Sequence, residues 1–187
     1  LDPINSFINN VLACVSILFI LGLDLNTMKK KFIDFTIPSG RGDINTIKKF
    51  KKKFKFIDES YNANPLSMTS AVKNMNYYKI KPKGQKLVFL SDMLELGKRS
   101  IKLHRKLSNV INRSNIDKVF VYGKHIKETF NFLHTNKKGK IFTSLDDAYA
   151  HFSKIVNNND LLMVKGSNAT GLNKFSKNIK KGQIGAI

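Results

Sequence analysis

Two patterns of hydrophobic residues alternate along the chain and predict its secondary structure. Continuous apolar runs such as Leu87-Val88-Phe89-Leu90 and Leu161-Leu162-Met163-Val164 are typical of strands that are buried on both faces of a sheet. Elsewhere apolar residues recur at helical spacing, as Met68, Val72 and Met75 do. The two patterns predict strands at 54–58, 86–91, 118–122, 140–142 and 160–164, and helices at 66–76, 100–112, 126–133, 145–156 and 172–179.

This alternation of strand and helix predicts an α/β fold with a mostly parallel, Rossmann-like sheet and helices on both of its faces. The cluster Pro38-Ser39-Gly40-Arg41-Gly42 is rich in residues that break helices and strands, and we interpret it as a linker. We expect the chain to divide there into residues 1–38, which carry a helical stretch, and residues 39–187, which form the α/β domain.

The apolar run from Val11 to Leu23 could be mistaken for a membrane span. It is too short to cross about 30 Å of hydrocarbon, and Leu1-Asp2-Pro3 lacks the basic residues that open a signal peptide. A buried helix, without membrane insertion, is therefore expected. The single cysteine, Cys14, excludes an internal disulfide and agrees with a cytoplasmic location.

The net charge of +20 would suit nucleic acid or an anionic membrane surface. The lysines are scattered, however, and no RNP, zinc-finger or recognition-helix pattern accompanies them, so a specific nucleic-acid partner is not expected. The histidines His125, His134 and His151 show no metal-ligand spacing with each other or with Cys14. No metal site built by the protein is predicted.

The segment Ile57 to Met68 holds the most informative chemistry, because it places acids, hydroxyls and carboxamides on a strand-to-helix connection. Ligands of open α/β sheets bind at that edge. Asn62 and Asn64 can donate and accept hydrogen bonds, whereas Asp58 and Glu59 only accept when ionised. This set suits a zwitterion or a ribose better than a bare anion. The alternative is an ordinary turn and helix start, in which the same residue types are common.

Three more polar segments follow predicted strands, namely Asp92 to Glu95, Gly123-Lys124 and Lys165 to Ser167. The carboxyl ends of parallel strands share one edge of the sheet. We therefore expect these segments to lie near residues 58–64 in space although they are distant in sequence.

The string Asp58-Glu59-Ser60-Tyr61-Asn62-Ala63-Asn64-Pro65 resembles the C-terminal-domain signature of the MurF group of the Mur ligase family. A Ser91 stands where that group usually has glycine, and Asn168 stands where an arginine is frequent. Further segments resemble the group's motifs in the same order along the chain: Asn10-Val11-Leu12-Ala13, Gly40-Arg41, Leu90 to Gly97 followed by His104, and Val164 to Ser167.

The resemblance implies an ATP-dependent ligase that joins D-alanyl-D-alanine to UDP-N-acetylmuramoyl-tripeptide in peptidoglycan precursor synthesis. ATP, bound with Mg²⁺, would phosphorylate the tripeptide carboxylate, and the dipeptide amine would attack the acyl phosphate. Residues 1–38 would then be the end of the central ATP-binding domain, and residues 39–187 the C-terminal domain. No G-x-x-x-x-G-K-[ST] phosphate loop occurs in the sequence. We expect a monomer that is inactive without partner N-terminal and central domains, which would carry most of the Mg²⁺ ligands.

The resemblance also suggests which residues face the nucleotide. Arg41 is expected to contact phosphate, because a guanidinium binds phosphate oxygens in bidentate fashion, although a solvated linker arginine is equally open. Glu59 stands where related ligases commonly carry an aspartate that contacts the nucleotide, and Asp58 could take that role instead. No residue is assigned to the chemical step itself.

A second set of residues is expected to bind the dipeptide. The carboxamides would bind its backbone-like groups, the acids its ammonium, and the Lys-Gly-Ser segment its carboxylate. Alternatives stay open for the carboxamides, which could cap the following helix, and for Asp92 and Glu95, which could lie in a solvated turn. His104 is expected to pack or hydrogen-bond inside its helix. The dipeptide set comprises Asn62, Asn64, Asp92, Glu95, Lys165 and Ser167.

Two other functions belong to different classes. A ligand-binding domain without catalysis would bind dipeptide or nucleotide without turnover. A basic nucleic-acid-binding module would bind DNA or RNA in a salt-sensitive way that survives substitution of Asn62 and Asn64.

Overall fold

The computed structural model describes residues 3–24, 26, 29, 33, 38–181 and 183–186. The chain forms two compact units, Leu1–Pro38 and Ser39–Ile187. We describe each of them by itself.

The first unit contains helix α1 (Pro3–Ile20), which confirms the helical stretch expected there. The expected burial is not met within the unit itself, since Phe19 is 74% exposed and Ile20 is 81% exposed. The described residues of α1 from position 10 onward are exposed or half-buried, so the unit by itself does not bury its apolar side chains. No helix in the described ranges is long and apolar enough to cross a bilayer.

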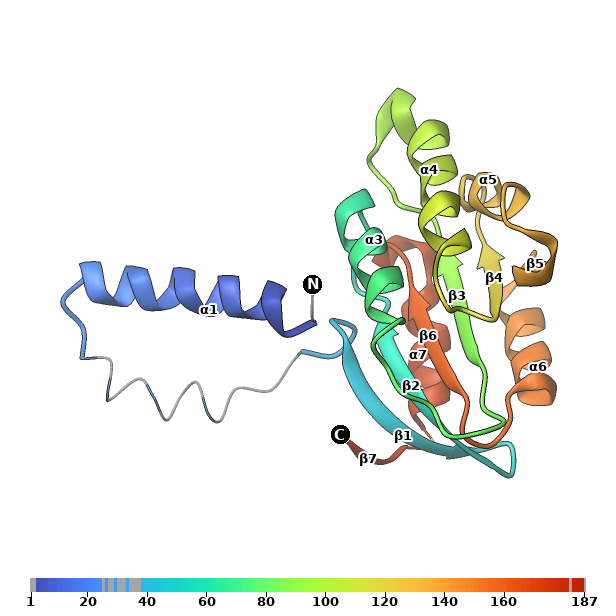
Figure 1. The fold of residues 1–187 in the computed structure, drawn as a ribbon, viewed down its shortest axis with the longest axis horizontal. Coiled ribbons are helices and arrows are strands. Elements are labelled where there is room, and N and C mark those ends of the chain that lie inside the picture. Colours follow the sequence, from blue (N-terminus) through green and yellow to red (C-terminus); the bar gives the residue numbers. More distant parts are fainter. Residues whose placement is uncertain are drawn as a thin grey trace. The chain divides into compact units, whose positions relative to one another are not determined.

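The second unit is built on a seven-stranded sheet with the strand order β5-β4-β3-β6-β2-β1-β7 (Figure 1). Strands β5, β4, β3, β6 and β2 pair in parallel, whereas β1 pairs antiparallel with both of its neighbours. The mostly parallel sheet is therefore confirmed. The strands are β1 (Asp43–Lys49), β2 (Lys52–Glu59), β3 (Lys86–Ser91), β4 (Lys118–Tyr122), β5 (Lys138–Phe142), β6 (Leu161–Lys165) and β7 (Gln183–Ala186).

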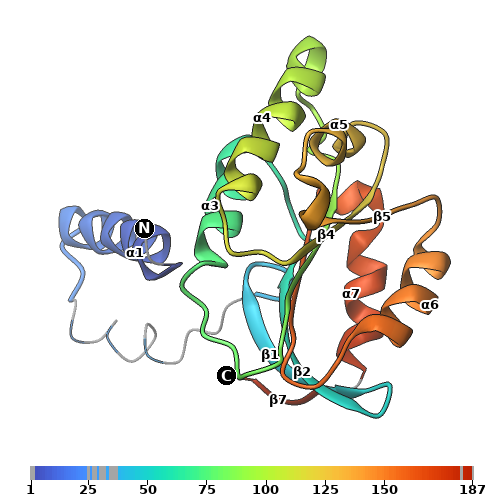
Figure 2. The same ribbon diagram turned by 45° about the vertical axis from the view of Figure 1, so that its right-hand side comes forward.

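Helices cover both faces of this sheet, as expected from the sequence (Figures 1 and 2). Val88 and Leu90 of β3 belong to a core with α3, α4 and α5, whereas Leu87 and Phe89 belong to a second core with α6 and α7. The period of two along a strand thus feeds both layers. The helices are α3 (Pro65–Asn74), α4 (Ser100–Asn112), α5 (Ile126–Asn131), α6 (Leu145–Ile155) and α7 (Leu172–Lys180), with short 3₁₀ turns at Gly97–Arg99, Thr135–Lys137 and Asn168–Thr170.

The antiparallel strands β1 and β7 were not predicted. The hairpin between β1 and β2 turns at Phe50 and Lys51, whose φ values are +55° and +59°. Two-residue hairpin turns with positive φ usually carry Asn-Gly or Asp-Gly, so this turn gives no recognisable sequence signal. The composition of β1 also hides its alternation, since the polar Asn45 is buried on the same face as Ile47 while Ile44 is only half-buried.

The face of the sheet toward which the chain continues after a strand changes at β6. Strand β6 lies between β2 and β3. The chain leaves β2 and β3 toward helices on one face, and it leaves β6 toward α7 on the other face. Such divergence at the carboxyl ends of parallel strands is where open α/β sheets bind ligands.

Candidate functional site

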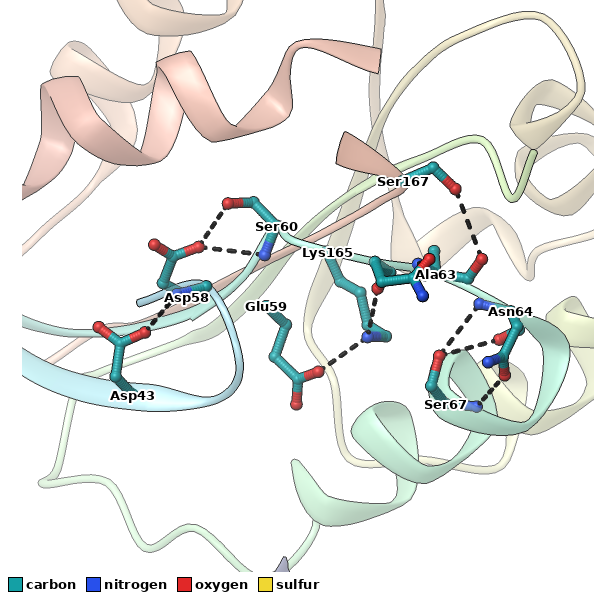
Figure 3. A network of polar contacts seen from close by, with 11 residues as sticks. Asp43, Asp58, Glu59, Ser60, Ala63, Asn64, Ser67, Lys165 and Ser167 are labelled. Atoms are coloured by element: carbon teal, nitrogen blue, oxygen red, sulfur yellow. Dashed lines mark hydrogen bonds and ion pairs between the residues drawn. The ribbon is translucent and has the colours of Figure 1, made fainter. Parts of the chain in front are cut away.

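An ion pair joins the carboxyl ends of β6 and β2. The Lys165 ammonium lies 2.8 Å from Glu59 Oε2 and also donates to the carbonyl of Asn62 at 3.1 Å. Figure 3 shows Lys165 between Glu59 and the loop that carries Ala63. The Lys165 side chain is only 3% exposed, whereas that of Glu59 is 25% exposed. The lysine is therefore a buried brace, and the carboxylate is its solvent-facing end.

The two carboxamides of the β2–α3 loop have different positions. Asn64 is the N-cap of α3: its Oδ1 accepts from Ser67 N at 2.8 Å, and Ser67 Oγ accepts from Asn64 N at 3.0 Å (Figure 3). This capping box occupies the side chain with a structural role. Asn62 Oδ1 accepts from Ala63 N at 2.8 Å, but the residue is exposed. Its Nδ2 has no hydrogen-bond partner among the residues that the structure describes.

Ser167 ties three loops together. Its Oγ accepts from Leu94 N at 3.0 Å and donates to the Ala63 carbonyl at 3.4 Å, while its backbone N–H donates to the Asp92 carbonyl at 3.1 Å. The β2, β3 and β6 segments therefore do converge at one edge. Ser167 is 7% exposed, which leaves little of it for a ligand.

The Asp92 carboxylate is committed to backbone groups before α5. Oδ2 accepts from Lys124 N at 2.9 Å, and Oδ1 accepts from His125 N at 2.9 Å and from Ile126 N at 2.7 Å. Gly123 permits this approach, since a Cβ there would lie 2.6 Å from Asp92 Oδ1. Asp92 thus caps a helix.

Glu95, by contrast, is exposed and has a positive φ of +62°. Its carboxylate has no ion pair within the described ranges. The two acids of the β3–α4 loop therefore differ, and Glu95 is the one that is free to meet a ligand.

His104 of α4 holds the β3–α4 loop. Its Nε2 accepts from Met93 N at 3.0 Å, which assigns the proton to Nδ1, and Nδ1–H donates to the Ser100 carbonyl at 2.8 Å. Burial lowers the pKa of His104 below its ordinary value of 6.5, against the opposing effects of the Ser100 hydrogen bond and the Asp92 charge. The predicted hydrogen-bonding role is confirmed, and it requires a neutral imidazole.

Asp58 faces away from solvent and belongs to a second polar cluster. Its Oδ1 accepts from Ser60 N at 3.1 Å and from Ser60 Oγ at 2.6 Å, and its Oδ2 lies 2.7 Å from the Lys180 ammonium. Lys180 also pairs with Asp43 at 2.6 Å. Sequence reasoning missed Asp43 and Lys180, because Asp43 is the first residue of an unrecognised strand and Lys180 lies in a lysine run.

Arg41 is exposed, and its guanidinium carbon lies 4.3 Å from the ring centroid of Tyr61, a cation–π contact that the sequence did not reveal. The flanking glycines have φ values of +82° at Gly40 and +97° at Gly42. A Cβ at Gly40 would lie 3.1 Å from Tyr61 Cβ, so the loop closely follows the β2–α3 connection. Arg41 is thereby held beside the site.

Gly166 lies tightly against β3. A Cβ at Gly166 would fall 2.4 Å from Ser91 Oγ and 3.0 Å from Ser91 Cβ. The Ser91 hydroxyl is fully buried and has no hydrogen-bond partner in the described part of the chain. The serine therefore occupies space at the junction of β3 and β6 without a polar contact.

The edge of the sheet at the carboxyl ends of its parallel strands thus presents four polar groups. They are a guanidinium, a carboxylate that is paired with a lysine, an exposed amide and a carboxylate without an ion pair in the described ranges. These groups can bind a polar ligand that carries both signs of charge, and none of them is arranged as a nucleophile with a base. No group of three or more His, Cys, Asp or Glu side chains in the described ranges could hold a metal ion. The four polar groups belong to the exposed Arg41, Asn62 and Glu95 and to the half-buried Glu59.

Comparison with known proteins connects the chain to a family. The family described as "Mur ligase, glutamate ligase domain" matches residues 44–168. The chain is 30% identical over 169 residues to the UDP-N-acetylmuramoyl-tripeptide--D-alanyl-D-alanine ligase of Rickettsia prowazekii, covering 90% of this chain and 36% of that protein. It is 31% identical over 176 residues to the ligase of the same name from Buchnera aphidicola subsp. Baizongia pistaciae, covering 93% of this chain and 36% of that protein. The chain therefore spans about a third of the length of these relatives.

Solved structures share the fold. A MurF structure from Acinetobacter baumannii has a TM-score of 0.76 at 20% identity and covers 95% of this chain and 38% of that chain. The MurF ligase of Thermotoga maritima, solved in complex with ADP, has a TM-score of 0.70 at 20% identity and covers 92% of this chain and 37% of that chain.

Proposed function

The chain belongs to the Mur ligase family, and on that basis we propose that it serves as the C-terminal domain of an ATP-dependent ligase that adds D-alanyl-D-alanine to UDP-N-acetylmuramoyl-tripeptide. One observation carries the proposal. The relatives from Rickettsia and Buchnera, about 30% identical over at least 90% of this chain, are both named for that activity.

The reaction that we propose has two steps. The tripeptide carboxylate attacks the γ-phosphorus of ATP, and ADP leaves with the electrons of the broken bond. The dipeptide amine then attacks the acyl phosphate carbon, loses a proton, and expels phosphate to give the amide. A domain without a nucleophile suits this chemistry, because its task is to orient the amine and to neutralise phosphate charge.

We assign roles according to which polar groups the fold leaves free. Arg41 and Glu59 face the nucleotide, and Asn62 and Glu95 face the dipeptide. Lys165 acts on both sets, because it holds the Glu59 carboxylate on the nucleotide side and the Asn62 carbonyl on the dipeptide side.

The other polar residues of the edge shape its loops, because their oxygens already accept or donate within the chain. Their substitution would alter the site through the backbone that they hold. This group comprises Asp58, Asn64, Asp92 and Ser167.

The first unit fits the same proposal as the end of a central ATP-binding domain. The exposed apolar side chains of α1 support this assignment, because they require a covering layer that such a domain would provide. Mg²⁺ would arrive with ATP, held mostly by residues of that central domain, and the enzyme would act as a cytoplasmic monomer.

The proposal is tested by ligation with the other domains supplied. This chain is mixed with the UDP-binding and phosphate-loop domains of a D-alanyl-D-alanine-adding ligase, ATP and UDP-N-acetylmuramoyl-tripeptide. ADP release is followed with and without D-alanyl-D-alanine. Variants Arg41→Ala and Asn62→Ala should each reduce dipeptide-dependent turnover about tenfold or more, because each removes a direct ligand contact.

The matched control is Asn109→Ala, an exposed residue on α4 that should leave turnover unchanged. Absence of dipeptide-dependent ADP release with a folded chain would overturn the proposal. Dipeptide binding by calorimetry without turnover would then favour a ligand-binding domain. Salt-sensitive RNA binding that survives Asn62→Ala would favour a nucleic-acid-binding module.

A further inference from the structure

The Lys180 ammonium connects three segments at the start of the second unit. It pairs with Asp43 Oδ2 at 2.6 Å and with Asp58 Oδ2 at 2.7 Å, and it donates to Ser39 Oγ at 2.9 Å. The side chains are largely buried, with exposures of 16% for Lys180, 20% for Asp43 and 4% for Asp58. One cation near the end of α7 therefore holds β1, β2 and the segment that precedes β1.

The two carboxylates need this cation. Asp43 and Asp58 are directly opposite each other in the antiparallel pairing of β1 and β2. Like charges in that arrangement repel, and their partial burial strengthens the repulsion. Burial lowers the pKa of Lys180, but the hydrogen bonds and charges of both aspartates outweigh it, so that the pKa lies above its ordinary value of 10.5. The ammonium is therefore charged at neutral pH.

The same carboxylates and their strands fix the loop around Arg41. Gly40 N donates to Asp43 Oδ1 at 2.8 Å, and Gly42 N donates to the Asp58 carbonyl at 2.7 Å. On the far side, Tyr61 N donates to the Gly40 carbonyl at 3.1 Å. Figure 3 shows Asp43 and Asp58 side by side on neighbouring strands, with Ser60 beyond them.

We propose that Lys180 is a positioning residue that holds the segment Ser39 to Gly42 and thereby keeps Arg41 over Tyr61. Without the ammonium, the two aspartates repel and Asp43 no longer presents a fixed acceptor to Gly40. The loop between the two glycines then opens while the sheet and helices stay folded. This inference concerns local order and does not depend on the proposed function.

A different role for Lys180 must be separated from this one. A lysine in the last turn of a helix stabilises that helix through the helix dipole. Lys177 lies in the same turn of α7 and is exposed, so it shares the dipole effect without touching the aspartates. Lys177→Met is therefore the matched control for Lys180→Met.

Digestion with an arginine-specific protease tests the proposal, because the sequence contains only four arginines: Arg41, Arg99, Arg105 and Arg113. Cleavage needs local opening of the backbone. The last two residues lie on α4 or at its C-terminal end, and Arg99 lies in the 3₁₀ turn before that helix, so all three report on opening elsewhere.

Lys180→Met should speed cleavage after Arg41 about tenfold or more, with cleavage at the other three sites unchanged, since hydrogen bonds to charged groups are lost. Lys177→Met should cleave like the unchanged protein, and Lys180→Arg should restore most of the protection. Unaltered cleavage after Arg41, or an equal increase at all four sites, would overturn the proposal.

A second variant keeps the test decisive if Lys180→Met does not fold. Asp43→Ala removes both the acceptor of the Gly40 N–H and one partner of the Lys180 ammonium. It should therefore increase cleavage after Arg41 selectively. A folded Asp43→Ala protein with no selective increase would also overturn the proposal. The assay contains no nucleotide or dipeptide, so its failure is distinguishable from failure of the ligase assignment.

Discussion

Glu59 and Lys165 are register partners at the ends of β2 and β6, and their ion pair is far more buried at the lysine than at the carboxylate. If Lys165 is removed, the half-buried Glu59 carboxylate can be solvated by water. If Glu59 is removed, the buried Lys165 ammonium keeps only its hydrogen bond to the Asn62 carbonyl and has little access to solvent. The cost of breaking the pair should therefore depend on which partner is removed.

We predict that Glu59→Met lowers the free energy of unfolding by about 3 kcal/mol and Lys165→Met by about 1 kcal/mol. Urea denaturation measures both, and the exposed Lys55→Met on β2 provides the control. Equal costs for the two substitutions would contradict the unequal burial.

Substitution of the two carboxamides of the β2–α3 loop should have different effects on stability, because only one of them caps a helix. Asn64→Ala removes the N-cap of α3 and should cost about 1 kcal/mol of stability. Asn62→Ala should change stability by less than about 0.5 kcal/mol, because the side chain is exposed. Thermal denaturation of the two variants checks the order, and a larger loss for Asn62→Ala would show that the capping assignment is wrong.

Among the acidic residues of the site, Asp92 should be the one whose substitution lowers the free energy of unfolding most. Asp92→Asn replaces an oxygen by an NH₂ group that faces backbone donors, so about 3 kcal/mol of unfolding free energy should be lost. Glu95→Gln, three residues further along the same loop and exposed, should change the free energy of unfolding by less than about 0.5 kcal/mol. Urea denaturation midpoints give both values, and a mild Asp92→Asn variant would refute the capping role.

His104 should make stability fall with acid. Its pKa is lower in the folded protein than its ordinary value of 6.5, so the unfolded chain binds the proton more readily. The contribution of the neutral imidazole is therefore complete above about pH 6.5, declines as the pH falls through the folded pKa, and is then constant. His104→Gln should remove this part of the decline, as measured by urea denaturation between pH 7.5 and pH 5.

The exposed His134→Gln is the control for that series. A His104→Gln protein whose stability falls with acid as steeply as that of the unchanged chain would contradict the burial of a neutral imidazole.

The sequence predicted the parallel core of the fold because its strands are apolar on both faces and its helices are periodic. It did not predict β1, whose hairpin turns at Phe50 and Lys51 without glycine or asparagine. Turn conformation there is imposed by the pairing of the strands, with residues Asp43 to Lys49 opposite Lys52 to Asp58. Local sequence alone carries no trace of that constraint.

The convergence of the polar segments was also predictable, since parallel strands end at one edge. The partners of individual side chains were not. Asn64 and Asp92 are of residue types that often bind ligands, yet their side-chain oxygens accept hydrogen bonds from nearby backbone N–H groups. Whether a carboxylate caps a helix or meets a ligand depends on distances of a few ångströms between segments, which residue types do not specify.

Ser91 and Gly166 share a single small volume where β3 meets β6. The two positions are consequently coupled in one direction: a side chain gained at 166 requires one lost at 91, whereas loss of the Ser91 side chain requires no change at 166. The order of substitution therefore matters: a change at 166 should be accepted only after Ser91 has become glycine, and mutant libraries of this domain should randomise the two codons together.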